Sequence, residues 1–153
     1  MKLPIPVVER ITQDILRTLT GALGRDGYTV QRRSRLGRTP GPGMIVVDDT
    51  ITATCEPAAQ EAVAWAKRYA VSCYVIEPEG TNMDSGSIRE GLVARVTWAL
   101  RRDYTRGGLA SDTEVLPAEA FDTSTDDQID GVHVMFSVHY ATDWNDPTIL
   151  RMG

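Results

Sequence analysis

A stretch of strict alternation near the C-terminus constrains the fold of this chain more than any other feature. Large apolar residues occupy every second position over 132–140, and the positions between them are mixed, including His133 and His139. A period of two places successive side chains on opposite faces of a strand. One apolar face and one mixed face indicate a long antiparallel strand with one side against the core. Phe136 and Val138 are therefore predicted core residues.

Two other segments have the period of a helix. Apolar residues recur at steps of three and four over 7–23, and Gly24 follows as the predicted stop. A second helix is predicted to open with the capping-box pattern Ser87 to Glu90 and to end near 103–104. The order helix, strands, helix, strand predicts an α+β fold: a mostly antiparallel sheet with two main helices packed on one face.

The remaining segments are shorter or ambiguous. We predict strands at 28–32 and 44–47 and a longer strand at about 67–77. Residues 56–66 favour a short helix by propensity and a strand by alternation, so their structure stays open. The polar stretch 109–130 is expected to hold at most one short strand, around 113–116. With 153 residues, the chain is expected to be a single domain over 1–153.

Charge is unevenly distributed along the sequence. The formal net charge is −5, but residues 1–106 carry 15 Lys/Arg against 12 Asp/Glu, and residues 107–150 carry nine acids and no base. This asymmetry can attract nucleic acid at one end or bring the basic side of one subunit to the acidic side of the next. Fourteen of the 16 basic residues are arginine, which reflects either the use of arginine at protein interfaces or genomic base composition.

Arginines precede a segment rich in glycine and proline. Arg32, Arg33, Arg35 and Arg38 lie within seven residues, and the chain then continues through alternating Pro and Gly to position 43. We predict a flexible loop at about 33–43 that is ordered against an anionic partner. That partner is an acidic protein surface or a phosphate backbone, and the alternative is a solvated loop. The absence of interleaved aromatics and the negative total charge disfavour a dedicated nucleic-acid domain.

Residue patterns for catalysis or metal binding are lacking in the sequence. His133 and His139 lie about 20 Å apart on an extended strand at roughly 3.3 Å per residue, too far to share one ion. Cys55 and Cys73 lack zinc-site spacing and are expected to be reduced, small buried hydrophobes. We therefore expect no enzyme activity, no metal and no cofactor. We also expect no membrane span, since no apolar run reaches about 20 residues, and no signal peptide.

Two segments in the last third combine into a recognisable pattern. The first is an aspartate followed by a double glycine at the end of the second helix, and the second closes the long strand. The matching residues are Asp103, Gly107, Gly108, Tyr140, Thr142, Asp146 and Pro147. This pattern, with an amphipathic helix at 7–23, resembles the tail-terminator (tail-completion) proteins of long-tailed bacteriophages. The order of elements agrees over nearly the whole chain, whereas the specific motifs cover only 103–110 and 138–147.

The resemblance implies a structural protein of the virion neck, assembled in the host cytoplasm. Members of that family form a homo-oligomeric ring, usually a hexamer, at the head-proximal end of the tail tube. The ring ends tube polymerisation and contacts the tail-tube protein on one side and the head connector or stopper on the other. DNA passes through its lumen without specific binding. The alternatives are another neck or head-completion subunit, or a small nucleic-acid-associated module that uses Arg32 to Arg38.

A ring needs a head-to-tail interface, and the two motif segments are its predicted sites. On this interpretation, an arginine at the end of the second helix pairs with a carboxylate from 111–130 of the next subunit. Gly107 and Gly108 are expected to adopt backbone angles that other residues avoid. The alternative is that both segments are ordinary surface turns. The predicted interface residues are Arg101, Arg102, Asp103, Arg106, Gly107, Gly108, Asp143, Asp146 and Pro147.

Overall fold

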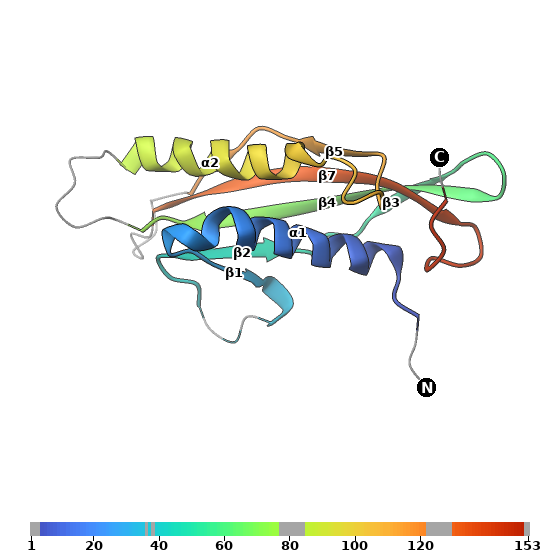
Figure 1. Ribbon diagram of the computed structural model, residues 1–153, viewed down its shortest axis with the longest axis horizontal. Helices are drawn as coiled ribbons and strands as arrows, with labels where there is room; N and C mark the ends of the chain where they lie inside the picture. The colour runs from blue at the N-terminus through green and yellow to red at the C-terminus, as the bar shows by residue number, and fades with distance from the viewer. Residues whose placement is uncertain (1–3, 36, 38, 77–84, 122–129, 152–153) are drawn as a thin grey trace.

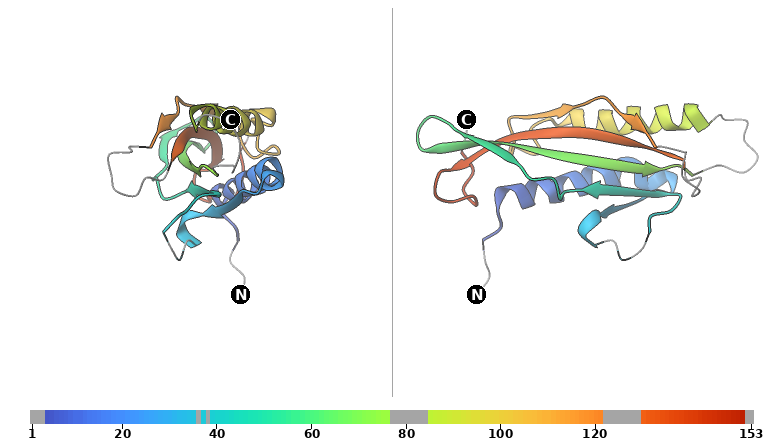
Figure 2. Two further views of the ribbon diagram at one scale, coloured as in Figure 1. Left: turned by 90° about the vertical axis from the view of Figure 1, so that its left-hand side faces the viewer. Right: turned by 180° about the vertical axis from the view of Figure 1, so that it is seen from behind.

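Two helices lie side by side on one face of a curved sheet. The computed structural model describes residues 4–35, 37, 39–76, 85–121 and 130–151. Helix α1 spans Val7–Leu23 and helix α2 spans Ser85–Arg102 (Figure 1). Seen from behind, the strands lie in front of both helices (Figure 2). The predicted α+β fold, with two helices on one face of a mostly antiparallel sheet, is confirmed.

Within the described residues, the sheet has seven strands in a mixed arrangement. Its main path runs β1-β2-β4-β7-β5, with β3 paired to β4 and β6 paired to β7. Only β1 and β2 are parallel; the other pairs are antiparallel. The strand bounds are β1 Thr29–Arg32, β2 Met44–Asp48, β3 Thr54–Pro57, β4 Ala62–Tyr74, β5 Asp112–Val115, β6 Glu119–Ala120 and β7 Gly131–Asp143.

The centre of the sheet is the pair of β4 and β7, each 13 residues long. They run antiparallel in unbroken register from Ala62 opposite Asp143 to Tyr74 opposite Gly131. Strand β4 therefore begins five residues before its predicted start at 67 and ends at Tyr74. The open segment 56–66 is no helix: it forms the hairpin between β3 and β4, which extends past the helices at one end of the molecule (Figure 1).

On its outer side, each of the two long strands pairs with two short strands in succession rather than with one continuous strand. Strands β2 and β3 pair with β4 one after the other, and the interruption between them is held by Lys67. Its ammonium donates to the carbonyl of Asp49 at 2.7 Å and to that of Ile51. Burial lowers the pKa of Lys67, and the carboxylates of Asp48 and Asp49 oppose that shift. Similarly, β5 and β6 pair in turn with β7, so the described part of 109–130 holds two strands where at most one was predicted.

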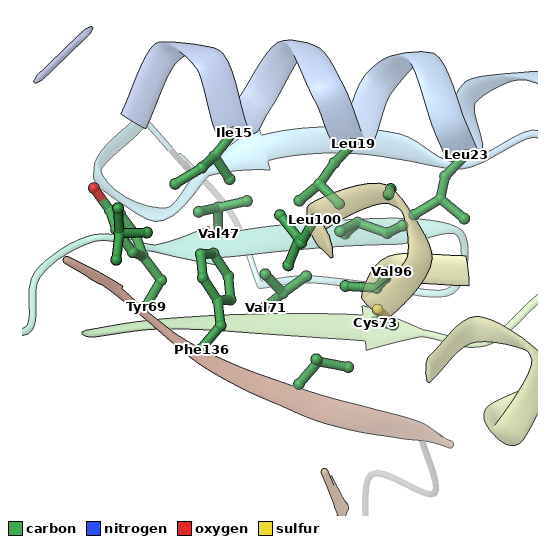
Figure 3. Close-up of a cluster of buried hydrophobic side chains, with 14 of the residues drawn as sticks. Ile15, Leu19, Leu23, Val47, Tyr69, Val71, Cys73, Val96, Leu100 and Phe136 are labelled. Carbon is green, nitrogen blue, oxygen red and sulfur yellow. The ribbon is translucent and has the colours of Figure 1, made fainter. Parts of the chain in front are cut away.

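Helix α1 begins and ends where its sequence period predicts. The buried side chains of Ile15, Leu19 and Leu23 point from it towards the sheet (Figure 3). Gly24 caps the helix as predicted, but it has helical angles and opens a short 3-10 helix, η1, Gly24–Asp26. The left-handed position is Gly27, at φ 86°.

Helix α2 starts earlier than its capping-box pattern predicts. It begins at Ser85, so Ser87 lies inside the first turn rather than before it, and the predicted start is wrong by two residues. Its end at Arg102 agrees with the sequence. The side chains that it packs into the core share one helical face, as predicted; the buried ones are Leu92, Val96, Ala99 and Leu100.

The core lies between the helices and the apolar face of β4 and β7. Phe136 and Val138 are fully buried, which confirms both predictions. The ring of Phe136 stacks on Tyr69, with centroids 5.2 Å apart. Cys73 is a buried thiol as expected, but Cys55 is exposed on β3, so its assignment as a buried hydrophobe is wrong. Within the described ranges, no helix is long and apolar enough to cross a membrane.

Candidate functional site

The chain between α2 and β5 forms a tightly bonded turn around Asp103. One carboxylate oxygen accepts from the Thr105 amide at 3.1 Å and from its hydroxyl at 2.6 Å, and the other accepts from the Gly107 amide at 2.8 Å. These hydrogen bonds, led by that of the Thr105 hydroxyl, lower the pKa of Asp103. Gly107 and Gly108 have φ of 67° and 89°, which confirms the predicted need for glycine.

Arg106 is part of the same turn, but it does not lie on the surface. It is 1% exposed, and one guanidinium nitrogen donates to the carbonyl of Leu100 at 2.6 Å and to that of Asp103. Another nitrogen lies 3.3 Å from a carboxylate oxygen of Asp14 on α1. Burial lowers the pKa of Arg106, and Asp14 opposes that shift. The prediction that Arg106 reaches a neighbouring subunit is therefore wrong: its side chain closes the end of α2.

The other two arginines of this region remain near the surface. Arg101 donates to Asp112 at 3.0 Å and to the carbonyl of Thr113 at 2.6 Å, so the partner expected from another subunit is present in its own chain. Arg102 is different, because its guanidinium lies 5.0 Å from the ring centroid of Trp98 and no carboxylate within the described residues pairs with it. The indole of Trp98 is 60% exposed.

The loop that follows β7 is also tied down by its own side chains. Asp143 pairs with Arg151 at 2.5 Å, and Asp146 accepts from the amide and the hydroxyl of Thr148 at 2.9 and 2.6 Å. The carbonyl of Pro147 accepts from the amide of Val7 at 3.0 Å, which joins this loop to the start of α1. The three predicted site residues therefore lie together at the end of the molecule that carries the β3–β4 hairpin.

A groove of about 800 Å³ lies where the two motif segments meet. Thr105 and residues 108–111 form one part of its wall, and residues 139–141 form another. The amide of Ser111 donates to the carbonyl of His139 at 2.8 Å, which fixes the two segments against each other. Much of the remaining wall comes from the β3–β4 hairpin and the C-terminal segment. The residues from these parts are Thr54, Cys55, Glu56, Ala58, Ala64, Trp65, Ala66, Leu150 and Arg151.

The groove is mostly apolar and is supported by an aromatic pair. The rings of Trp65 and Tyr140 stack at a centroid distance of 6.3 Å, and the indole nitrogen of Trp65 donates to the hydroxyl of Thr142 at 2.9 Å. Burial raises the pKa of Tyr140 to about 12. Sequence reasoning missed the hairpin side of this site, because residues 56–66 gave both helical and strand patterns.

Two side chains of the arginine run, those of Arg32 and Arg33, have acidic partners within the chain. Arg32 binds both carboxylate oxygens of Glu9, at 2.6 and 2.7 Å, and donates to Asp49 at 2.6 Å, so its guanidinium joins α1 to the sheet. Arg33 lies 3.4 Å from Asp48. Arg35 lies in a 3-10 helix, η2 Arg33–Arg35, where no regular structure was expected. Arg38 lies outside the described residues, and the flexibility predicted for 33–43 stays a prediction.

The charge asymmetry is partly neutralised within the subunit. Arg89 pairs with Asp130 at 2.5 Å, and Arg101 pairs with Asp112 at 3.0 Å. Both pairs join the basic part of the sequence to the acidic part. These two carboxylates are therefore already paired, as is Asp143, which pairs with Arg151.

The two histidines bind different partners on the mixed face of β7. His133 Nδ1 lies 2.9 Å from the hydroxyl of Ser72, and burial lowers its pKa. His139 Nε2 lies 3.3 Å from a carboxylate oxygen of Glu114. Among the described residues, no group of three or more His, Cys, Asp or Glu side chains is placed to hold a metal ion.

No protein-family model matches the chain, and no curated protein matches it at a significant level.

Proposed function

We propose that this protein is a structural subunit of a bacteriophage neck. It forms a ring at the head-proximal end of the tail tube, ends tube polymerisation and joins the tail to the head connector. The observation that carries the proposal is the convergence of 103–110 and 138–147. The resemblance depends on these two segments, and they lie side by side on one groove.

The rigidity of both segments supports an assembly role. Asp103 and Asp146 each bind backbone amides of their own loop, which fixes the loop before any partner arrives. A preorganised loop loses less conformational entropy on association than a mobile one. Exposed aromatic and arginine side chains, the types that most often dominate binding energy, lie nearby at Trp98, Arg102 and Tyr104.

The partners in this proposal are further copies of the chain, the tail-tube protein and the head connector or stopper, with DNA passing through the lumen. The alternative nucleic-acid module has less support than the sequence suggested. Arg32, the first of its four arginines, already binds Glu9 and Asp49, so fewer positive charges remain to neutralise phosphates.

The test combines the mass in solution with a phage phenotype. Light scattering of the purified protein should give an integral multiple of 16.8 kDa, and negative-stain images should show closed rings, alone or on isolated tail tubes. Deleting the gene should give tails of abnormal length that fail to join heads. Normal-length tails with unjoined heads would indicate another neck subunit. A monomer that forms no ring with tubes present, from a gene whose loss leaves infectious particles, would contradict both roles.

A further inference from the structure

An aromatic and a cationic side chain protrude together from the outer face of α2. Trp98 is 60% exposed, and the guanidinium of Arg102 lies 5.0 Å from its ring centroid. One helical turn separates the two residues, so they share one face of the helix. Stacking restricts the indole, which reduces the entropy lost when a partner covers it. We call Trp98 and Arg102 the α2 patch.

The groove between the motif segments is complementary to the α2 patch, because it offers an open apolar space and a carboxylate that is unpaired among the described residues. Its volume of about 800 Å³ falls in the range of roughly 300–1,000 Å³ typical of binding sites. Ala64 and Ala66 contribute small side chains to its wall, and Trp65 also lines it. Glu56 stands exposed in its wall, and no basic group of the described chain pairs with it. Arg151, also in the wall, is already neutralised by Asp143.

We propose that the groove receives the α2 patch of a second copy of this chain, with Trp98 inserted between its apolar walls and Arg102 paired with Glu56. Neither patch residue lines the groove of its own subunit, so the contact joins two different surfaces. Such a contact repeats from copy to copy and closes into a ring if the rotation permits. The inference rests on the proposed ring and names the surfaces that build it.

Charge complementarity is what selects a second copy as the occupant. Arg102 and Glu56 each lack an ionic partner in the described part of their own chain, and each lies beside the apolar surface to be covered. An arginine that reaches a carboxylate at the rim of an apolar groove fixes the register of the docked indole. Arg101 and Arg151, in contrast, already pair with Asp112 and Asp143 of their own chain, so neither needs a partner from a second copy.

Cross-linking of the full chain tests the contact directly. Cys55 is an exposed thiol in the groove wall, and Cys73 is buried, so one reactive thiol already marks the groove. Ala94→Cys places a second thiol one turn from Trp98 without removing it. A short bis-maleimide should then join Cys55 of one copy to position 94 of the next. Denaturing gels should show a series of cross-linked oligomers up to the number of subunits in the ring. The matched controls are Ala94→Cys with Cys55→Ser, and Arg17→Cys on the outer side of α1.

Substitutions test the energetics of the same contact. Trp98→Ala should weaken self-association roughly 30-fold or more, and Arg102→Glu should weaken it at least about tenfold. Adding Glu56→Arg to Arg102→Glu should restore most of the loss. Arg17→Glu, a reversal at an arginine whose side chain is 79% exposed, should have little effect. Circular dichroism must show that each variant is folded.

The outcomes separate this contact from the ring itself. Rings without the cross-link, or rings unaffected by Trp98→Ala, would overturn the contact and leave the proposed function standing. Cross-linked dimers that never extend would support the contact but contradict a ring, because a two-fold interface closes after two copies. A protein that stays monomeric with tail tubes present would contradict both the contact and the proposed ring.

Discussion

Replacing Arg106 by alanine should destabilise the fold by about 3 kcal/mol. The substitution removes donors from the carbonyls of Leu100 and Asp103 and leaves Asp14 only the exposed Arg17, 3.9 Å away, as its cation. A hydrogen bond from a charged group contributes about 1.5–3 kcal/mol, and breaking a buried ion pair costs about 3–5 kcal/mol. The lower end applies here, because the Asp14 side chain is 21% exposed and two guanidinium nitrogens of Arg106 lack hydrogen bonds.

The backbone at this position allows a second, independent comparison. Arg106 has φ 51°, in the left-handed region where a side chain costs about 1 kcal/mol relative to glycine. Arg106→Gly removes the same guanidinium and also relieves this strain. It should therefore be less destabilising than Arg106→Ala by about 1 kcal/mol.

Urea denaturation followed by circular dichroism measures both quantities, provided that the slopes of the transitions agree. A loss below about 1 kcal/mol for Arg106→Ala would refute the structural role of the guanidinium. Equal stability of the alanine and glycine variants would refute the argument from backbone strain. If Arg106→Ala were stable but no longer assembled, the arginine would belong to the interface after all.

Three further predictions address the core, the turn and the hairpin. Phe136→Ala should cost about 3–5 kcal/mol in urea titration, because the ring is fully buried; a loss under 1 kcal/mol would contradict this. The folded state holds the pKa of Asp103 below its usual 3.8, so its stabilisation is present above about pH 4 and is lost as pH falls. Asp103→Asn should therefore reduce the acid dependence of stability between roughly pH 5 and pH 2, and an unchanged profile would argue against the turn. Gln60 and Glu61 occupy φ of 61° and 60° at the hairpin tip. Glu61→Gly should stabilise the protein by about 1 kcal/mol, and a lower midpoint of the urea transition would contradict the argument from backbone strain.

Periodicity determined the parts of the fold that depend on one buried face. The spacing of Ile11, Ile15 and Leu19 was enough to predict α1, and the alternation around Phe136 was enough to predict β7. Both patterns are local, since each residue needs only its own neighbours to define the face that the core covers. The double glycine after Asp103 was similarly informative, because left-handed angles favour glycine whatever surrounds them.

Segments with competing local preferences were decided by their partners. Residues 56–66 carry helical propensity and strand alternation together, and pairing with β7 along all of β4 selected the strand. The short strands β3 and β6 exist because a long neighbour offers them backbone hydrogen bonds. Lys67 could not be placed from sequence, because the carbonyls that hold it belong to an interruption between two other strands.

The destination of each polar side chain was decided by the tertiary structure alone. Arg32, Arg102 and Arg106 are equally basic in the sequence, yet one joins α1 to the sheet, one stacks on an exposed indole and one is buried at a helix end. Charge patterning along a chain gives no distances, and a charged group is buried only where donors and acceptors from remote segments meet it. The groove has the same origin, because its walls come from four separate parts of the chain that only folding brings together.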